Sequence, residues 1–187
     1  MWTGMFYWLH QIMLAGLVTV VFLAMLSIVY MSIRNGISPM PASSAVRREA
    51  AAEINKLTGR GTLVEAGSGW GTLALHAAKA CPGWRIIGIE NSVLPLWTSR
   101  LLARFFQGST SVTFRSGDIY TYSYKDANAV ICYLYPGAMK RLSSVLADGL
   151  APGATIISIC FAVPGWHAER VITCRDLYRT PIYVYTI

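Results

Sequence analysis

The stretch Leu63-Val64-Glu65-Ala66-Gly67-Ser68-Gly69-Trp70-Gly71-Thr72 decides how this chain folds. An apolar run carries one carboxylate, three glycines follow at alternate positions, and a helical pattern covers residues 73–80 directly after them. A strand, a glycine-rich turn and a helix start form a geometry in which backbone N–H groups face a ligand and no side chain blocks its approach. The stretch therefore predicts a nucleotide-type ligand site at the end of a buried strand.

Apolar strand patterns alternate with helical patterns along the rest of the chain. We expect strands at residues 62–66, 85–90, 112–115, 129–133, 154–161, 170–174 and 181–187, and helices at residues 45–57, 70–80, 93–107 and 138–146. This alternation predicts an α/β fold, with a mostly parallel, Rossmann-like sheet of seven strands and helices on both faces. The last two strands leave no room for a helix between them, so we expect an antiparallel edge.

The beginning of the chain predicts a membrane anchor. The first 33 residues contain no Lys, Arg, Asp or Glu, and residues 13–33 form an apolar run that is long enough, at about 1.5 Å per residue, to cross a bilayer core of ~30 Å. A cleaved signal peptide is the alternative, but no basic n-region and no A-x-A site accompany the run. We therefore expect an N-terminal transmembrane helix at residues 1–34, a linker at residues 35–44 and a second domain at residues 45–187. The aromatic residues at both ends of the run resemble interfacial belts, and they are Trp2, Phe6, Tyr7, Trp8 and Tyr30.

Charge sets the orientation of this anchor. All 16 basic and 9 acidic residues follow residue 33, so the net charge of +7 belongs to the part after the anchor and suits nucleic acid, an anionic membrane face or an acidic partner. Because Arg34, Arg47 and Arg48 follow the run and no basic residue precedes it, the positive-inside rule predicts a domain on the cytoplasmic side. A bacterial or archaeal inner membrane is favoured, and the mitochondrial inner membrane is the alternative.

The residues around the glycine turn exclude the common phosphate sites. A P-loop needs a Lys-Ser or Lys-Thr pair after its glycines, and none is present. A dinucleotide fingerprint needs a third glycine where Thr72 stands, and Glu65 would face its pyrophosphate. An acidic side chain beside the loop instead suits a ligand with a cationic amino group or a sulfonium.

Two further carboxylates complete the predicted cofactor site. Glu90 ends the second strand, where a carboxylate accepts both ribose hydroxyls of a nucleoside, and Asp118 follows the third strand, where it can accept from an adenine amine. Ile119 would lie beside the ring. The candidate cofactor-binding residues are Glu65, Gly67, Ser68, Gly69, Gly71, Glu90, Asn91, Asp118 and Ile119.

The motif Glu65-x-Gly67-x-Gly69-x-Gly71, with Glu90 and Asp118, resembles the motifs of class I S-adenosylmethionine-dependent methyltransferases, which implies S-adenosylmethionine as cofactor. Trp70 stands where many relatives carry an acidic residue; because the loop is expected to act through backbone N–H groups, we expect binding to survive. Other segments are similar to a family of small protein-lysine methyltransferases, which includes archaeal enzymes of broad specificity and membrane-anchored mitochondrial enzymes for the c-subunit of ATP synthase or the adenine nucleotide translocase. These segments are Pro39-x-Pro41, Pro152–Phe161, Gly165-Trp166 and Val184–Ile187.

Aromatic residues supply the candidates for substrate contact. Tyr133-Leu134-Tyr135-Pro136 follows the fourth strand, where this fold places its substrate-facing motif, and it lacks the leading Asn or Asp of amide and base methylases. We expect Tyr133 and Tyr135 to line a channel for the lysine amine, with Trp166 as a second wall; the alternative is that they pack the strand ends. An apolar, aromatic mouth lowers the pKa of a lysine amine and stabilises the developing cation.

The sequence therefore predicts a membrane-anchored protein-lysine N-methyltransferase that acts on a membrane or membrane-proximal protein, with neither nucleic acid nor metal as a partner. A methyltransferase for a lipid-phase small molecule, such as a quinone or a phospholipid amine, and a non-catalytic cofactor-binding module are the alternatives. Arg100 and Arg104 form a basic stripe that faces either solvent or an acidic lipid or protein. The four cysteines include no C-x-x-C pair and predict buried thiols, and no two histidines have the spacing of metal ligands.

Overall fold

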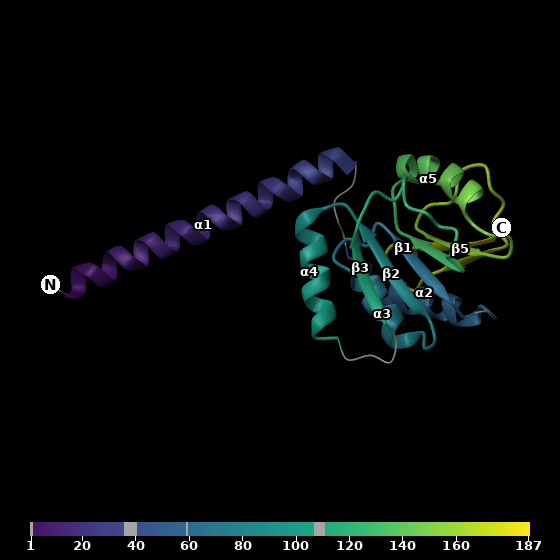
Figure 1. Cartoon of the computed structure of the whole chain (residues 1–187), viewed down its shortest axis with the longest axis horizontal. Helices are drawn as coiled ribbons and strands as arrows, with labels where there is room; N and C mark the ends of the chain where they lie inside the picture. Colours follow the sequence, from purple (N-terminus) through teal and green to yellow (C-terminus); the bar gives the residue numbers. More distant parts are fainter. Residues whose placement is uncertain (1, 36–40, 59, 107–110) are drawn as a thin grey trace. The chain divides into compact units, whose positions relative to one another are not determined.

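The computed structural model describes residues 2–35, 41–58, 60–106 and 111–187. It separates into two compact units, Met1–Ser38 and Pro39–Ile187, and each is described here by itself (Figure 1). Three predicted features lie partly outside the described residues. These features are the linker, at residues 36–40; the end of the helix predicted to reach residue 107; and the turn that includes Gly59.

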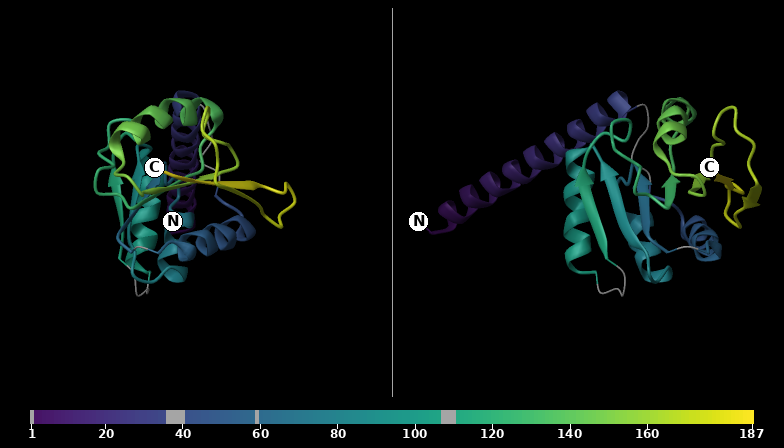
Figure 2. Two further views of the ribbon diagram at one scale, coloured as in Figure 1. Left: turned by 90° about the vertical axis from the view of Figure 1, so that its right-hand side faces the viewer. Right: turned by 45° about the vertical axis from the view of Figure 1, so that its right-hand side comes forward.

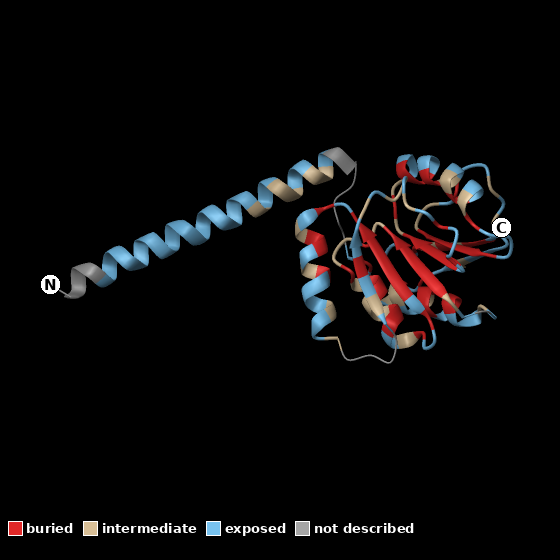
Figure 3. Cartoon of the chain, viewed as in Figure 1, coloured by how far each residue is buried: buried red, intermediate tan, exposed pale blue. Residues whose placement is uncertain are grey.

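The first unit is a single long helix, α1 (Trp2–Asn35). Within the described residues, one helix is long and apolar enough to cross a membrane by length and composition; its apolar part is Phe6–Ile33, with a mean hydropathy of 2.7. Every described side chain from residue 6 to residue 23 is exposed, as the pale blue of α1 shows (Figure 3). The helix starts before the apolar run at residue 13 and includes the aromatic residues that precede this run.

The second unit is built around one sheet, which has seven strands in the described residues. The strand order is β3-β2-β1-β4-β5-β7-β6, and β1 to β5 pair in parallel. This confirms the predicted Rossmann-like sheet. The strands are β1 (Thr62–Ala66), β2 (Arg85–Glu90), β3 (Val112–Ser116), β4 (Ala129–Cys132), β5 (Thr155–Ile159), β6 (Arg170–Thr173) and β7 (Pro181–Thr186).

Antiparallel pairing lies at the β5 side of the sheet, where it was expected. β7 pairs antiparallel with β5, and β6 then pairs antiparallel with β7. The outermost strand is therefore β6, and the strand that runs against the others is the second from the edge. The reason is that β6 and β7 form a hairpin, whose turn carries the chain back beside β5.

Four helices of the described residues cover the sheet. α2 (Ser44–Lys56), α3 (Thr72–Ala80) and α4 (Val93–Arg104) contribute to the apolar core on one face, and α5 (Pro136–Gly149) contributes to the core on the other (Figure 2). The Ser43 hydroxyl accepts a hydrogen bond of 3.3 Å from the Val46 N–H, as a helix N-cap does. Pro136 starts α5 two residues before the predicted helix, because its missing N–H costs nothing in a first turn.

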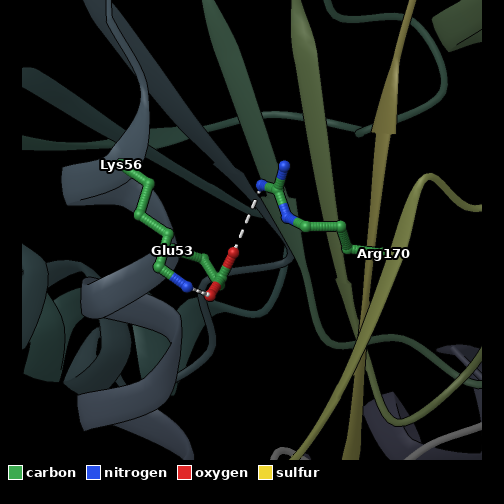
Figure 4. A network of polar contacts seen from close by, with 3 residues as sticks. All are labelled: Glu53, Lys56 and Arg170. Atoms are coloured by element: carbon green, nitrogen blue, oxygen red, sulfur yellow. Dashed lines mark hydrogen bonds and ion pairs between the residues drawn. The ribbon is translucent and has the colours of Figure 1, made fainter.

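A buried glutamate connects α2 to the edge strand. Glu53 forms an ion pair with Lys56 on its own helix and with Arg170 on β6, at 3.3 Å from the Arg170 guanidinium (Figure 4). The Glu53 side chain is 2% exposed, whereas those of its two partners are 60% and 47% exposed. The contact links the second helix of the chain to a strand more than one hundred residues later.

The topology fixes where a ligand site can lie. The carboxyl ends of β1 to β5 meet at one edge of the sheet because these strands are parallel. The strand order reverses between β1 and β4, and the crevice outside the carboxyl ends at such a point is where α/β sheets bind ligands.

Candidate active site

The glycine-rich loop after β1 depends on left-handed backbone at three positions. Gly67, Gly69 and Gly71 have φ angles of 77°, 50° and 75°, which glycine adopts without steric cost. Gly71 is also the N-cap of α3, and a Cβ placed there would lie 2.6 Å from the Phe114 ring and 2.7 Å from the Ser99 Cβ. The loop is therefore pressed against β3 and α4 and has one conformation available to it.

The amides of this loop bind the protein itself, contrary to our expectation that they face a ligand. The N–H groups of Gly67 and Ser68 donate to the Ile89 carbonyl at 3.0 and 2.9 Å, and the Gly71 N–H donates to the Ser68 carbonyl at 2.8 Å. The Gly69 N–H donates to Glu90 Oε2 at 2.7 Å. The parallel pairing of β1 with β2 places the end of β2 beside the loop, so these four donors are satisfied internally.

Glu90 is the acidic residue that this arrangement positions. Its side chain is buried, Oε2 accepts from the Gly69 N–H, and Oε1 accepts from the Ser92 N–H at 2.7 Å. A carboxylate offers about four lone-pair sites, so two backbone donors leave acceptor capacity for the two hydroxyls of a ribose. The backbone thus holds the carboxylate in a fixed orientation at the carboxyl edge.

Glu65 is a second buried carboxyl group on the same edge. Oε2 accepts from the Ala74 N–H at 3.0 Å, which ties the end of β1 to the first turn of α3. Burial raises the pKa of the Glu65 carboxyl well above its ordinary value, and the negative charge of Glu90 raises it further. A cationic group that approached Glu65 would offset both effects, whereas an anion would add to them.

The other predicted cofactor residues lie around these two glutamates. Asp118 is exposed at the end of β3, and its Oδ1 accepts from the Tyr120 N–H at 2.9 Å. Ile119 is half-buried against the core on the α5 face, and Asn91 is exposed after Glu90. The Ser68 side chain is buried, and a Cβ at Gly88 would lie 2.9 Å from the Ser68 Cβ. The Ser68 side chain therefore packs close to β2, and its hydroxyl is a buried group without a hydrogen-bond partner among the described residues.

The residues at this edge fit S-adenosylmethionine. Its ribose has two hydroxyls that match the acceptor-only carboxylate of Glu90, and its cationic amino and sulfonium groups match the acidic surroundings of Glu65. The loop contains no Lys or Arg, and four of its amides donate to acceptors within the protein.

The three candidate substrate residues divide between the two faces of the sheet. Tyr133 packs against the core that α2 and α3 contribute to, whereas Tyr135 and Trp166 pack against the core on the α5 face. Trp166 also meets Tyr185 edge to face, with ring centroids 6.1 Å apart. Leu134 lies between the two tyrosines, and its Cδ2 would be 2.8 Å from a Cβ at Gly67. The aromatic groups thus lie on opposite faces of the sheet.

Asp176, in the turn between β6 and β7, was missed by the sequence analysis. Its two carboxylate oxygens accept from the Thr180 N–H at 2.7 Å and the Thr180 hydroxyl at 2.6 Å. Burial raises the pKa of the Tyr133 hydroxyl, and the neighbouring Cys160, Asp176 and Cys174 raise it further. The Asp176 charge is thus one of the groups that raise the pKa of Tyr133. In the sequence Asp176 is one acid in a short polar turn, and no pattern relates it to Tyr133.

The cysteines confirm the prediction of buried thiols at three positions. Cys81, Cys132 and Cys174 are buried and Cys160 is half-buried, and none of these four described residues forms a disulfide. Burial raises the pKa of Cys132 to about 12 and that of Cys81 to about 11. Since the thiolate is the reactive form, these side chains behave as apolar packing groups.

Comparison with known proteins gives a consistent result. A family model described as the ANTKMT methyltransferase domain matches residues 65–170, which run from the first acidic residue of the glycine motif to the start of β6. The ATP synthase C-subunit lysine N-methyltransferase of Rattus norvegicus is 31% identical over 111 residues, which are 59% of this chain and 50% of that protein. The protein of the same name from Homo sapiens is 30% identical over 112 residues, which are 60% of this chain and 47% of that protein. The chain thus spans about half the length of the curated relatives it matches.

A solved structure resembles the second unit closely. It is an RNA methyltransferase from Salinibacter ruber in complex with S-adenosyl-L-homocysteine, with a TM-score of 0.70 and 28% sequence identity. The similarity covers 79% of this chain and 94% of that chain. S-adenosylhomocysteine is what S-adenosylmethionine becomes when its methyl group is transferred.

Proposed function

This chain belongs to the ANTKMT methyltransferase domain family, and we propose that it is a membrane-anchored enzyme that methylates a lysine side chain of a membrane or membrane-proximal protein. Its cofactor is S-adenosylmethionine. The observation that carries the proposal is the acidic, internally bonded loop at the carboxyl edge, together with curated relatives that are named as lysine N-methyltransferases.

The proposed cofactor contacts follow the geometry of the edge. Glu90 would accept from the ribose hydroxyls, Glu65 would face the cationic end of the ligand, and Asp118 with Ile119 would border the adenine. When it is bound, S-adenosylmethionine supplies a methyl group that is already activated by a sulfonium. The protein therefore has to deliver a neutral amine in line and exclude water, and it needs no strong general base.

The proposed amine contacts are Tyr133, Tyr135, Trp166 and Asp176. The Asp176 carboxylate would attract a lysine ammonium, and the Tyr133 hydroxyl, with its raised pKa, stays protonated and uncharged beside it. Tyr135 and Trp166 would form the opposite, apolar wall, where partial desolvation lowers the pKa of the lysine amine. Ring faces stabilise the positive charge that develops on the amine nitrogen as it accepts the methyl group.

Anchoring is supported by the length and composition of α1. The Phe6–Ile33 segment is apolar enough to span, and the first basic residues follow it. This asymmetry supports a catalytic domain on the cytoplasmic side, in a bacterial or archaeal inner membrane or, as the alternative, the mitochondrial inner membrane. Arg48 is exposed in the first turn of α2, where contact with anionic headgroups would explain a basic residue that opposes the helix dipole.

Two other substrate classes compete with protein lysine. A lipid-phase amine or quinone would benefit equally from an anchor. RNA is the substrate class in the name of the Salinibacter ruber relative, and the net charge of +7 suits it. Against RNA, Tyr133 stands where base methylases place an Asn or Asp, so the edge lacks the side chain that would hold an exocyclic base amine.

One labelling experiment separates these classes. Purified full-length protein in detergent would be incubated with methyl-labelled S-adenosylmethionine and with protein, lipid and RNA fractions of membranes from the source organism. We expect the label in protein and, after hydrolysis, in methyl-lysine. At a concentration of S-adenosylmethionine below the wild-type dissociation constant, Glu90→Gln should lower labelling roughly 10- to 150-fold. Glu53→Gln changes a buried glutamate that pairs with Lys56 and Arg170, and it should retain labelling. Label confined to lipid or to RNA would overturn the lysine assignment.

A further inference from the structure

The outer side of α4 carries an apolar stripe that the second unit leaves uncovered. The side chains of Val93, Trp97, Leu101 and Phe105 are 63%, 68%, 53% and 77% exposed. They are four residues apart, so they lie above one another along one side of the helix. The opposite side of α4 is buried against the sheet. A contiguous row of large exposed apolar side chains marks an interaction surface.

Two arginines border this stripe. Arg100 and Arg104 are exposed, and the helical spacing places them along the Val93 and Trp97 side of the row. The Arg100 Nε–H donates to the Phe114 carbonyl at 3.0 Å, which ties this guanidinium to β3. A helix with Trp, Leu and Phe on one side and basic residues along its margin has the composition of helices that lie in a membrane interface.

The covalent chain keeps this surface near a bilayer if α1 spans one. Residues 36–43 separate the end of α1 from the start of α2, and a chain of this length reaches at most about 30 Å. The anchor therefore confines the second unit to the headgroup side of the membrane. A second copy of the chain is a poorer occupant, because a symmetric contact through this stripe would bring the arginines of both copies together. An anionic lipid surface complements them.

We infer that α4 lies in the plane of the membrane interface, with the row of Val93, Trp97, Leu101 and Phe105 at the acyl boundary and Arg100 and Arg104 on anionic lipid phosphates. The inference rests on the anchoring part of the proposed function. α4 begins directly after the Glu90–Ser92 segment, so docking of α4 holds the β2 end of the cofactor edge at the interface. A lysine of a membrane protein that emerges at headgroup level is then within reach of the site.

Spin labelling of the full-length protein in nanodiscs tests this placement. A nitroxide on Leu101→Cys reports collisions with oxygen, which concentrates in the bilayer, and with a water-soluble nickel complex. The matched control is Ala147→Cys, an exposed position on α5. Both variants carry Cys160→Ser, because Cys160 is the half-buried native cysteine. Burial raises the pKa of Cys81, Cys132 and Cys174, so these native thiols react slowly with the label.

In nanodiscs that contain phosphatidylglycerol, we expect the label at residue 101 to be reached by oxygen and shielded from nickel, and the label at residue 147 to be reached by nickel. Adding Trp97→Ser and Phe105→Ser should lower the ratio of docked to undocked protein at least about tenfold. The affinity for S-adenosylmethionine, measured on the same sample, should stay unchanged and show that the variant is folded.

The inference is overturned if the label at residue 101 is as open to nickel as the label at residue 147. It is also overturned if the label at residue 101 is shielded from both oxygen and nickel, because another protein surface then covers α4. If the chain fails to enter nanodiscs, the predicted anchor is wrong. If the chain enters them and the label at residue 101 is open to nickel, only the docking surface is wrong. Methyl-lysine formation is measured in the separate labelling experiment, which tests the lysine methyltransferase assignment by itself.

Discussion

Replacing Glu90 by glutamine should weaken cofactor binding more than any other conservative change in this site. The carboxylate receives the Gly69 N–H on Oε2 and the Ser92 N–H on Oε1, both at 2.7 Å, in a buried environment. Glutamine keeps the shape but offers one acceptor oxygen, so one of the two backbone donors meets an NH₂ group. A buried donor without an acceptor costs about 1–3 kcal/mol, and the remaining hydrogen bond loses its charge assistance. We expect a loss of about 2–4 kcal/mol in the free energy of unfolding.

Glu90→Gln should also weaken the binding of S-adenosylmethionine. If the Glu90 carboxylate accepts from the ribose, removing its charge weakens at least one charge-assisted hydrogen bond, which contributes about 1.5–3 kcal/mol. The dissociation constant for S-adenosylmethionine should then rise roughly 10- to 150-fold. Isothermal titration calorimetry of the full-length protein in detergent measures this constant, and a thermal unfolding curve of the same sample measures the stability.

The matched control is Glu53→Gln. Glu53 is equally buried but binds Lys56 and Arg170, on α2 and β6, rather than the loop. This variant should unfold at a lower temperature and bind the cofactor with unchanged affinity. If Glu90→Gln also bound S-adenosylmethionine with unchanged affinity, the ribose assignment would be refuted, and Glu90 would be a residue that holds the loop in shape.

Three further outcomes follow from the same edge. Gly71→Ala should lower the free energy of unfolding by about 2–4 kcal/mol, because its Cβ meets the Phe114 ring at a positive φ; unchanged chemical denaturation would contradict the described loop. Because the pKa of Glu65 is raised in the folded state, the contribution of this group to stability is full below its ordinary value of 4.5 and is lost as pH rises through the native pKa. The melting temperature of Glu65→Gln should therefore fall less between pH 5 and pH 8 than that of the wild type, and parallel curves would argue against a buried acid. Asp176→Asn should raise KM for a lysine substrate about two- to fivefold without changing cofactor affinity, and an effect on cofactor affinity alone would exclude an amine contact.

The strands could be predicted from the sequence because burial on both faces leaves a continuous apolar run. β1 and β2 begin and end at the predicted residues, and every residue of β1 is buried. The ends of α5 were less accurate: the helix extends to Gly149, where the apolar periodicity has already stopped. Periodicity reports the side of a helix that packs, and it does not report the exposed turns at either end.

The partners of the glycine loop could not be predicted, because they depend on the register between two strands. The Ile89 carbonyl reaches Gly67 and Ser68 because β1 pairs with β2 so that Ala66 stands opposite Ile89. The glycine spacing shows that the loop is tight, but a tight loop can direct its amides either outward or inward. The placement of Tyr133 and Tyr135 on opposite faces of the sheet could not be predicted either. Strand β4 ends at Cys132, so the alternation of side chains along a strand does not apply to the two tyrosines.

The inward direction of these amides bears on which ligands the site can select. Glycine loops that bind phosphates present several N–H groups to an anion at the start of a helix. Here the amides of Gly67 and Ser68 bind a carbonyl, and the amide of Gly69 binds a carboxylate. Because these amides point inward, the glycine loop holds the Glu90 carboxylate in place. The carboxyl edge therefore carries the acidic side chains of Glu90 and Glu65. An anionic nucleotide would be repelled by the Glu90 carboxylate, whereas a nucleoside that carries a sulfonium and an amino group would be attracted to it. If Glu90 and Glu65 contact the ligand as proposed, the β1–β2 register favours a methyl donor over a phosphorylated cofactor.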